Sequence, residues 1–216
     1  MNVALYRLIA GFRRFREKYF QGDAHEHSMY QRLTSSGQTP KTLLIGCSDS
    51  RVDPALMTGA SPGDLFVIRN VANLVPPCEP ANVGLHGTSS AIEFAVTGLK
   101  VENIIVLGHR QCGGIRALMT GNTEEPHTFV GKWMMIAKEA RERIDREHPG
   151  LDEEQRCRLG EKEAILVSLK NLRTFPFVEE AIKSRNMNLI GVYFDLERGE
   201  LWEYNDTTRS FRQLEI

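Results

Sequence analysis

Short apolar runs recur along this chain of 216 residues, separated by longer stretches with helical periodicity. Runs of five to seven residues that are rich in Ile, Leu and Val are typical of strands buried on both faces of a sheet. We expect strands at 42–46, 64–69, 103–108 and 188–194. We expect helices at 87–99, 129–146 and 152–172, and a further short helix near Pro176. Because strands that alternate with helices form parallel sheets, the pattern predicts an α/β fold with a central, mainly parallel sheet covered by helices on both faces.

The two ends of the chain differ from this alternating middle. Residues 3–19 carry apolar side chains at spacings of three and four, with basic residues over much of the remaining surface, which predicts an amphipathic helix. Such a helix can lie on a membrane, but the near-neutral charge of the chain favours packing on its own domain or on a partner subunit. Residues 199–204 and 209–212 alternate in polarity and predict a hairpin that adds an antiparallel edge to the sheet. We therefore expect an N-terminal helical arm at 1–35 and a single α/β domain at 36–216.

Charge balance and hydropathy pattern argue against several classes of protein. Lys and Arg number 27 against 28 Asp and Glu, a formal net charge of −1, whereas a bulk nucleic-acid binder needs a basic excess. No apolar run reaches the roughly 18 residues that a membrane span needs. The N-terminal residues also lack the unbroken apolar core of a signal peptide. We therefore expect a cytoplasmic protein that binds neither nucleic acid nor membrane and whose four cysteines are reduced thiols.

Metal-binding residue types follow two of the predicted strands. Cys47 comes directly after the first strand, and His109 and Cys112 follow the third. Because ligands gather at the carboxyl ends of parallel strands, we expect these side chains to meet at one edge of the sheet. Two thiolates and an imidazole suit Zn²⁺, and three protein ligands leave the fourth position open, as in catalytic zinc sites. Taken alone, the H-x-x-C pair is weak evidence, and Cys47 also fits a small buried residue at the end of a strand.

Asp49 and Arg51 follow Cys47 at alternate positions. Two ionisable groups directly after a buried strand are costly unless they are paired or solvated. In one interpretation they form a charge-assisted pair, and Arg51 orients Asp49 beside the metal. In the other, Asp49 caps the following helix and Arg51 is exposed to solvent. Both interpretations remain open at this point.

Three motifs in a fixed order connect the chain to a known family. The chain resembles the β-class carbonic anhydrases, with features of the plant-type subgroup, in CSDSR at 47–51, RNVANLVPP at 69–77 and GHRQCGG at 108–114. The resemblance implies a zinc lyase that hydrates CO2 reversibly to bicarbonate and a proton, with a zinc-bound hydroxide as the nucleophile. It also implies a homodimer or a dimer of dimers, with the active site at a subunit interface and pocket walls drawn from two chains.

The resemblance further assigns roles residue by residue. The implied zinc ligands are Cys47, His109 and Cys112. The implied catalytic residues are Asp49, Arg51 and Gln38, of which Gln38 donates a hydrogen bond to the substrate. The implied substrate pocket is lined by Phe66, Val71, Phe94 and Gly113, with Phe94 where plant members carry tyrosine.

Two alternatives stand beside CO2 hydration. Some relatives with the same zinc ligands hydrolyse carbon disulfide or carbonyl sulfide, and the shape of the access channel that separates them is not visible in a sequence. The other alternative is a non-catalytic zinc protein, or a redox protein that uses Cys47 and Cys112. Neither of these has a use for Asp49, Arg51 and Gln38, which argues against both.

Overall fold

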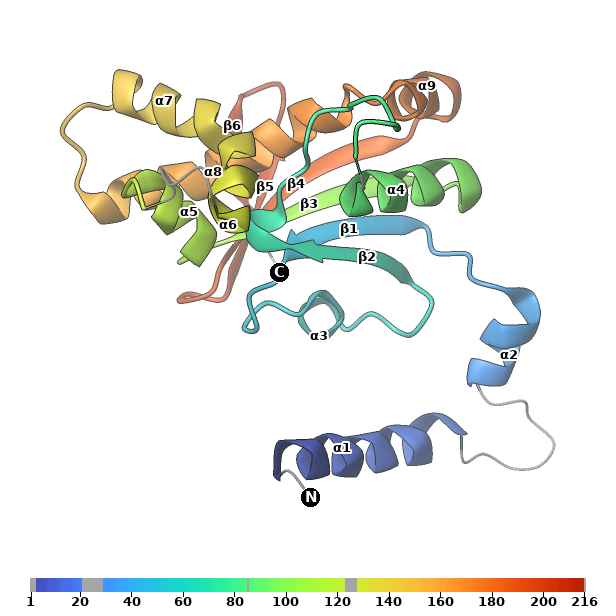
Figure 1. Ribbon diagram of the computed structural model, residues 1–216. Helices are drawn as coiled ribbons and strands as arrows, with labels where there is room; N and C mark the ends of the chain where they lie inside the picture. Colours follow the sequence, from blue (N-terminus) through green and yellow to red (C-terminus); the bar gives the residue numbers. More distant parts are fainter. Residues whose placement is uncertain (1–2, 21–28, 85, 123–127, 216) are drawn as a thin grey trace. The chain divides into compact units, whose positions relative to one another are not determined.

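The computed structural model describes residues 3–20, 29–84, 86–122 and 128–215, in two compact units, Met1–Thr39 and Pro40–Ile216 (Figure 1). The boundary between the units lies four residues after the expected end of the N-terminal arm at residue 35. Within the described residues, no helix has the length and apolar character that crossing a membrane requires.

The described part of the N-terminal unit contains two helices. Helix α1 spans Val3–Phe20, which confirms the predicted amphipathic helix, and α2 spans Met29–Ser36. The two helices pack through aromatic rings, with the ring centroids of Phe15 and Phe20 at 5.4 and 5.0 Å from that of Tyr30. Apolar side chains of α1 remain exposed, since none of its residues is buried.

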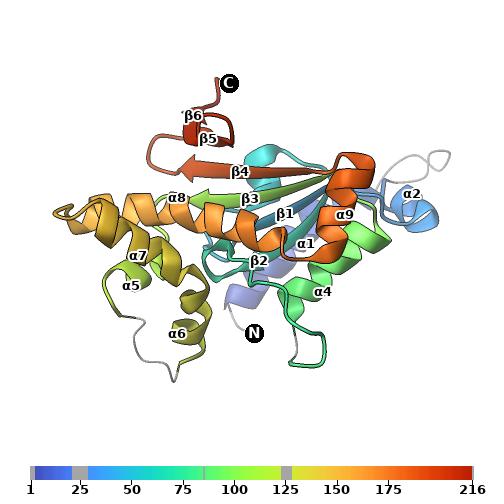
Figure 2. The same ribbon diagram turned by 90° about the horizontal axis from the view of Figure 1, so that it is seen from above.

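The second unit is built around one six-stranded sheet (Figures 1 and 2). Its strands are β1 (Thr42–Cys47), β2 (Leu65–Asn70), β3 (Asn103–His109), β4 (Asn188–Asp195), β5 (Glu200–Asn205) and β6 (Ser210–Gln213). They lie in the order β2-β1-β3-β4-β5-β6, with β2, β1, β3 and β4 parallel and the β5–β6 hairpin antiparallel at one edge. The predicted strands and the edge hairpin are therefore confirmed.

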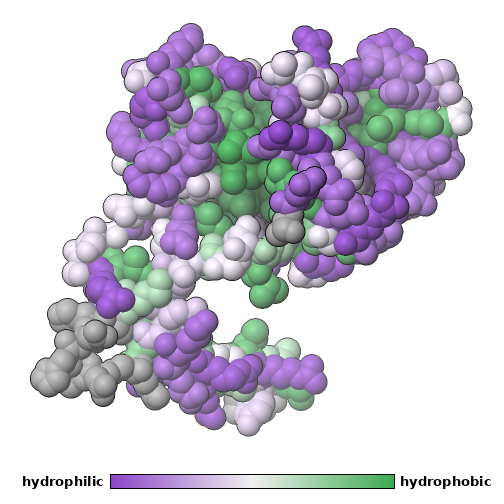
Figure 3. Space-filling view, turned by 180° about the vertical axis from the view of Figure 1, so that it is seen from behind, coloured by the Kyte–Doolittle hydropathy of each residue, from purple (hydrophilic) through white to green (hydrophobic). Residues whose placement is uncertain are grey.

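Helices α4 (Gly87–Glu93), α8 (Glu153–Leu172) and α9 (Pro176–Arg185) lie on one face of this sheet (Figure 2). Their apolar side chains form the main core with fully buried residues of the strands, such as Ile45 and Ile104. On the opposite face lies the short helix α3 (Pro54–Thr58), and Val67 of β2 is still 40% exposed there. Figure 3 shows hydrophobic surface on this side of the unit. Helices over both faces were expected, and the second face has much the thinner cover.

The helices between the strands differ in detail from the sequence expectation. The helix expected at 129–146 is divided into α6 (Phe129–Met134), a 3-10 turn (Met135–Ala137) and α7 (Lys138–Glu147). The backbone of Ala137 leaves the helical region at φ −99° and ψ 16°, while its side chain is buried in a second core cluster. The helix expected at 87–99 is α4 continued by a π-helical turn, Phe94–Gly98. The remaining helical segments are the 3-10 turn Val71–Asn73 and α5 (Gly113–Met119).

Two glycines allow α8 to approach the sheet closely. A Cβ on Gly108 of β3 would lie 2.7 Å from Ile165 Cδ1, and a Cβ on Gly191 of β4 would lie 2.9 Å from Ile165 Cγ2. Distances this short are overlaps, so a side chain at either position would force the Ile165 side chain or α8 itself to move. The close approach brings α8 beside the carboxyl end of β3, where the functional residues gather.

Candidate metal centre

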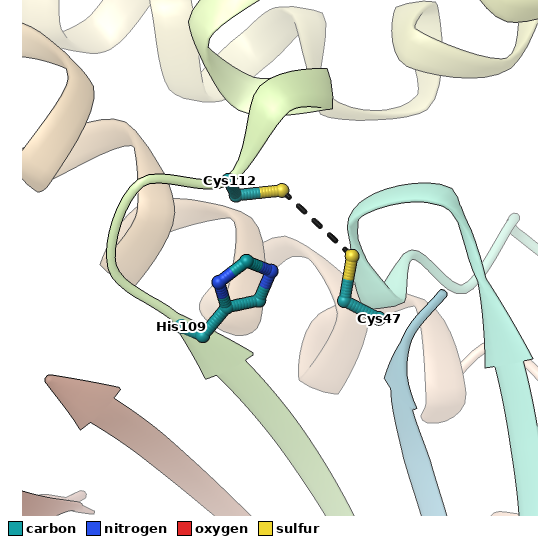
Figure 4. Close-up of side chains that lie close together, drawn as sticks. All are labelled: Cys47, His109 and Cys112. Carbon is teal, nitrogen blue, oxygen red and sulfur yellow. Dashed lines mark hydrogen bonds between the residues drawn. The ribbon is translucent and has the colours of Figure 1, made fainter. Parts of the chain in front are cut away.

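Three metal-binding side chains meet at the carboxyl ends of β1 and β3. Cys47 ends β1, His109 ends β3, and Cys112 immediately precedes α5 (Figure 4). One ligand atom from each lies within 4.8 Å of the other two, and the side chains are 6%, 1% and 2% exposed. The strand-end argument thus predicted a cluster that the fold does assemble.

The geometry of this cluster fits a tetrahedral zinc ion. With Zn–S bonds of about 2.3 Å, two sulfur ligands at the tetrahedral angle lie about 3.8 Å apart. The Sγ atoms of Cys47 and Cys112 are 4.0 Å apart. Nδ1 of His109 lies 2.8 Å from the carbonyl oxygen of Arg110, while Nε2 is buried with no hydrogen-bond partner. Because a proton on Nδ1 can satisfy the carbonyl, the Nε2 lone pair is left free for a metal, the usual arrangement of zinc-binding histidines.

In the metal-free cluster the two cysteines differ in protonation: Cys47 is already a thiolate that can bind a metal, whereas Cys112 keeps its proton. The hydrogen bond with Cys112 lowers the pKa of the Cys47 thiol to about 4. The same bond, together with burial, raises the pKa of Cys112 well above its ordinary value. Burial lowers the pKa of His109, but the Cys47 thiolate outweighs it and the net shift is upward. The metal-free cluster therefore retains protons that a bound cation must displace.

Asp49 and Arg51 form an ion pair next to this cluster. Nε and Nη2 of Arg51 donate to the two carboxylate oxygens of Asp49 at 3.0 and 2.7 Å. These bonds hold the pKa of Asp49 well below its usual range. Oδ2 of Asp49 lies 4.0 Å from Nε2 of His109, so an ionised carboxylate faces the ligand atoms. The helix that follows is capped by Asp53, whose side chain accepts the N–H of Leu56, and the ion-pair interpretation of Asp49 is the one that the structure has.

Arg69 of β2 organises the loop between Cys47 and Asp49, a role that the sequence analysis missed. Its Nε donates to the carbonyl oxygen of Cys47 at 2.9 Å and its Nη2 to that of Asp49 at 2.7 Å. Its Nη1 pairs with the Asp53 carboxylate at 3.2 Å. One guanidinium thus binds the backbone on both sides of the loop that carries a metal ligand and an acidic residue. Its place in the RNVANLVPP motif was visible, but the strand register that gives it these partners was not.

Glu161 of α8 is a second residue that the sequence analysis missed. It is 3% exposed, and its carboxylate accepts the backbone N–H of Cys112 at 3.1 Å and the hydroxyl of Tyr193 at 2.8 Å. Burial raises its pKa, although both donors oppose this shift. Its spacing from Ala164, Ile165 and Ser168 on a helix was the signal that it faces the core.

The residues expected to line the substrate pocket divide into two groups. Val71 and Gly113 lie at the metal cluster. Gly113 follows Cys112, with open space where a Cβ would be, and a Cβ on neighbouring Gly114 would lie 2.9 Å from Val71 Cγ1. Gln38, the expected hydrogen-bond donor to the substrate, is exposed and belongs to the N-terminal unit.

Phe66 and Phe94 lie at the other end of the strands. In the register of β1 and β2, Phe66 pairs with Leu43 and Asn70 with Cys47. Four residues of extended strand span about 13 Å. The rings of Phe66 and Phe94 contact each other with centroids 5.8 Å apart, and Phe94 is 50% exposed. Within a single chain, these two rings therefore stand apart from the metal cluster.

Known proteins resemble this chain in both sequence and structure. The sequence profile of the carbonic anhydrase family matches residues 42–201. Beta carbonic anhydrase 3 of Arabidopsis thaliana is 38% identical over 217 residues, which cover 96% of this chain and 81% of the relative. The structure of the β-carbonic anhydrase CcaA matches with a TM-score of 0.89 at 33% identity, covering 100% of this chain and 94% of the other. A tetrameric β-carbonic anhydrase of Sordaria macrospora matches with a TM-score of 0.73 at 31% identity, covering 93% and 94%.

The match of the family profile covers most of the chain, and the relatives align over nearly its whole length. The Cys–His–Cys cluster and the fold that brings it together lie within the matched region. This chain belongs to the β-class carbonic anhydrase family.

Proposed function

We propose that this chain catalyses the reversible hydration of CO2 to bicarbonate and a proton, on a zinc ion held by Cys47, His109 and Cys112. The observation that carries the proposal is the buried Cys–His–Cys cluster with an ionised carboxylate 4.0 Å from one of its ligand atoms. Zn²⁺ bound there supplies an acidified water, because zinc lowers the pKa of bound water to about 7. Three protein ligands leave the fourth position for it.

The neighbouring residues have proposed roles that follow from their chemistry. Because Arg51 keeps Asp49 ionised, its carboxylate accepts hydrogen bonds throughout the working pH range. It can therefore orient a hydrogen-bond donor that lies beside the three metal-binding side chains. Val71 offers an apolar wall for an apolar substrate, and the open space at Gly113 admits that substrate beside Cys112. The family resemblance supports a further proposal, that Gln38 donates a hydrogen bond to a substrate oxygen as negative charge develops during the reaction.

We also propose that the active unit is a homodimer or a dimer of dimers. Phe66 and Phe94 are exposed or half-buried apolar rings on the far end of the strands, which suits a wall that one copy supplies to the pocket of another. The thin cover on the second face of the sheet and the exposed apolar side chains of α1 also offer surface for a partner subunit. A relative of this fold is tetrameric. The proposed location is the cytoplasm, where the thiols that bind zinc stay reduced.

The test is CO2 hydration by stopped flow with a pH indicator on zinc-loaded protein, from about pH 6.5 to about pH 9, a range that spans the expected pKa of zinc-bound water. We expect fast turnover that Cys47→Ser and Asp49→Ala abolish. Cys78→Ser is the matched control, since Cys78 is an exposed thiol that takes no part in the cluster, and it should leave turnover unchanged. Wild-type protein with one zinc per chain and no CO2 hydration at any pH would refute the proposal, and carbon disulfide would then be the substrate to assay.

A further inference from the structure

Arg51 has more partners than the carboxylate that it orients. Its side chain is 48% exposed, and an exposed arginine loses little free energy by leaving a carboxylate for water. Two further contacts restrain it here: Nη2 donates to the carbonyl oxygen of Gln111 at 3.1 Å, and Nη1 donates to Oε1 of the same residue at 3.3 Å. Arg51 is thus held between Asp49 on one side and Gln111 on the other.

Gln111 adopts a backbone conformation that is unusual for its residue type. Its φ is 58°, in the left-handed region, where residues other than glycine are strained. In this conformation both its carbonyl oxygen and its side-chain amide contact the same guanidinium. A strained residue between two metal-binding positions, His109 and Cys112, is a feature that the surrounding structure has to maintain.

Glu197 supplies that support from a distant part of the chain. It lies in the turn after β4, and its Oε1 accepts a hydrogen bond from Nε2 of Gln111. Its Oε2 pairs with the guanidinium of the buried Arg110 at 2.6 Å, and its backbone N–H donates to Asp195 at 3.0 Å. These two contacts fix the position of Glu197 independently of its hydrogen bond with Gln111.

We propose that Gln111 and Glu197 are positioning residues for the reaction: Gln111 holds Arg51 against Asp49, and Glu197 holds the Gln111 amide. Neither residue is proposed to touch substrate or metal. The inference rests on the proposed function, because it is the orientation of Asp49 beside the zinc ligands that gives the contact a kinetic effect.

The variants separate positioning from structural support. Gln111→Ala removes the amide and keeps the backbone carbonyl, and Glu197→Ala removes the carboxylate that holds the amide. Glu197→Gln keeps an oxygen that can accept from Gln111, so it is the conservative rescue. Glu154→Ala is the matched control, because Glu154 also pairs with Arg110, at 2.9 Å, but makes no contact with Gln111.

We expect kcat/KM for CO2 hydration to fall about tenfold in both alanine variants, the lower end of what loss of an outer partner costs at metal sites. Zinc content should stay at one per chain. Glu197→Gln and Glu154→Ala should remain within about twofold of wild type. A purely structural role would instead lower the zinc content or the melting temperature of both alanine variants, and that result would overturn the inference.

A second readout does not depend on activity. In metal-free protein labelled with ¹⁵N-arginine, the Nε–H of Arg51, which donates to Asp49 at 3.0 Å, gives a signal that Arg51→Lys identifies by its loss. Exchange of this proton with water should become several-fold faster in Gln111→Ala and Glu197→Ala and should not change in Glu154→Ala. Unchanged exchange together with unchanged kcat/KM overturns the inference. If wild-type protein fails to hydrate CO2, the proposed function fails, and the exchange rates still decide whether Gln111 restrains Arg51.

Discussion

Replacing Arg69 tests whether one guanidinium holds the loop between Cys47 and Asp49 in place. Arg69→Ala leaves two backbone carbonyl oxygens without their charged donor. A hydrogen bond that involves a charged group contributes about 1.5–3 kcal/mol when it is shielded from water. The Arg69 side chain is 29% exposed, so the lower end of this range applies and water partly replaces both bonds. The ion pair with Asp53, whose carboxylate is 48% exposed, adds little.

The expected cost of Arg69→Ala is therefore about 2–3 kcal/mol in the free energy of unfolding. For a chain of this length, 1 kcal/mol shifts the melting temperature by about 2–4 °C, so we expect a decrease of about 4–12 °C. The assay is thermal unfolding of the metal-free protein at a fixed concentration, followed by circular dichroism. Because the loop carries a metal ligand, we also expect zinc to bind about tenfold more weakly in competition with a chelator.

The control for this prediction is Arg173→Ala. Arg173 donates to Glu179 at 2.9 Å, but its side chain is 53% exposed, so its loss should cost less than about 1 kcal/mol. Arg69→Lys should lie close to Arg69→Ala, because one ammonium group cannot reach both carbonyl oxygens and the carboxylate in the same geometry. If Arg69→Ala unfolds at the temperature of Arg173→Ala and binds zinc as tightly as wild type, the loop does not depend on Arg69 and the reasoning is wrong.

Three further predictions concern the surroundings of the cluster. The folded-state pKa of Asp49 is depressed, so its ion pair stabilises the fold above the unfolded pKa of about 3.9, and this contribution is lost as the pH falls below that value. In urea titrations at about pH 7, Asp49→Asn should have a lower free energy of unfolding than wild type. The difference between the two proteins should become smaller below about pH 4. Tyr193→Phe removes one of two donors to the buried Glu161 carboxylate and should cost about 1–3 kcal/mol in the free energy of unfolding by the same titration; an unchanged free energy of unfolding would contradict this. Gly108→Ala places a methyl group 2.7 Å from Ile165 Cδ1 and should destabilise the protein by about 1–3 kcal/mol, and an unchanged melting temperature would mean that α8 yields at this point.

The sequence predicted the elements whose patterns are long or strongly apolar. The four parallel strands were found because branched apolar residues follow one another without interruption, and α8 because its 20 residues show several helical turns. Helix α2 was not predicted, α3 was considered only as the helix that Asp49 would cap in one open interpretation, and α5 was not predicted. They have 8, 5 and 7 residues, too few for an apolar face to repeat, and packing against the rest of the fold holds α3 and α5 in place.

The metal cluster could be predicted from the sequence, whereas the residues that hold it in place, Arg69 and Glu161, could not, for one physical reason. Cys47, His109 and Cys112 come together through a general rule, that parallel strands end at the same edge of a sheet. Arg69 and Glu161 reach their partners through strand register and through the close approach of α8, and neither follows from a local pattern. Both become visible only when the distance between elements is known.

Phe66 shows where a family resemblance stops being informative. The family resemblance names it as a pocket residue, and the register of β1 and β2 places it about four strand residues from the level of Cys47. A strand in the middle of a parallel sheet is held by hydrogen bonds on both sides, and β1 therefore cannot slide to bring its own Cys47 to Phe66. For Phe66 to line a pocket at a Cys–His–Cys cluster, the cluster must belong to a second copy of the chain. A family resemblance suggests which residues line a site, but the geometry of the sheet decides whether one chain alone can bring them together.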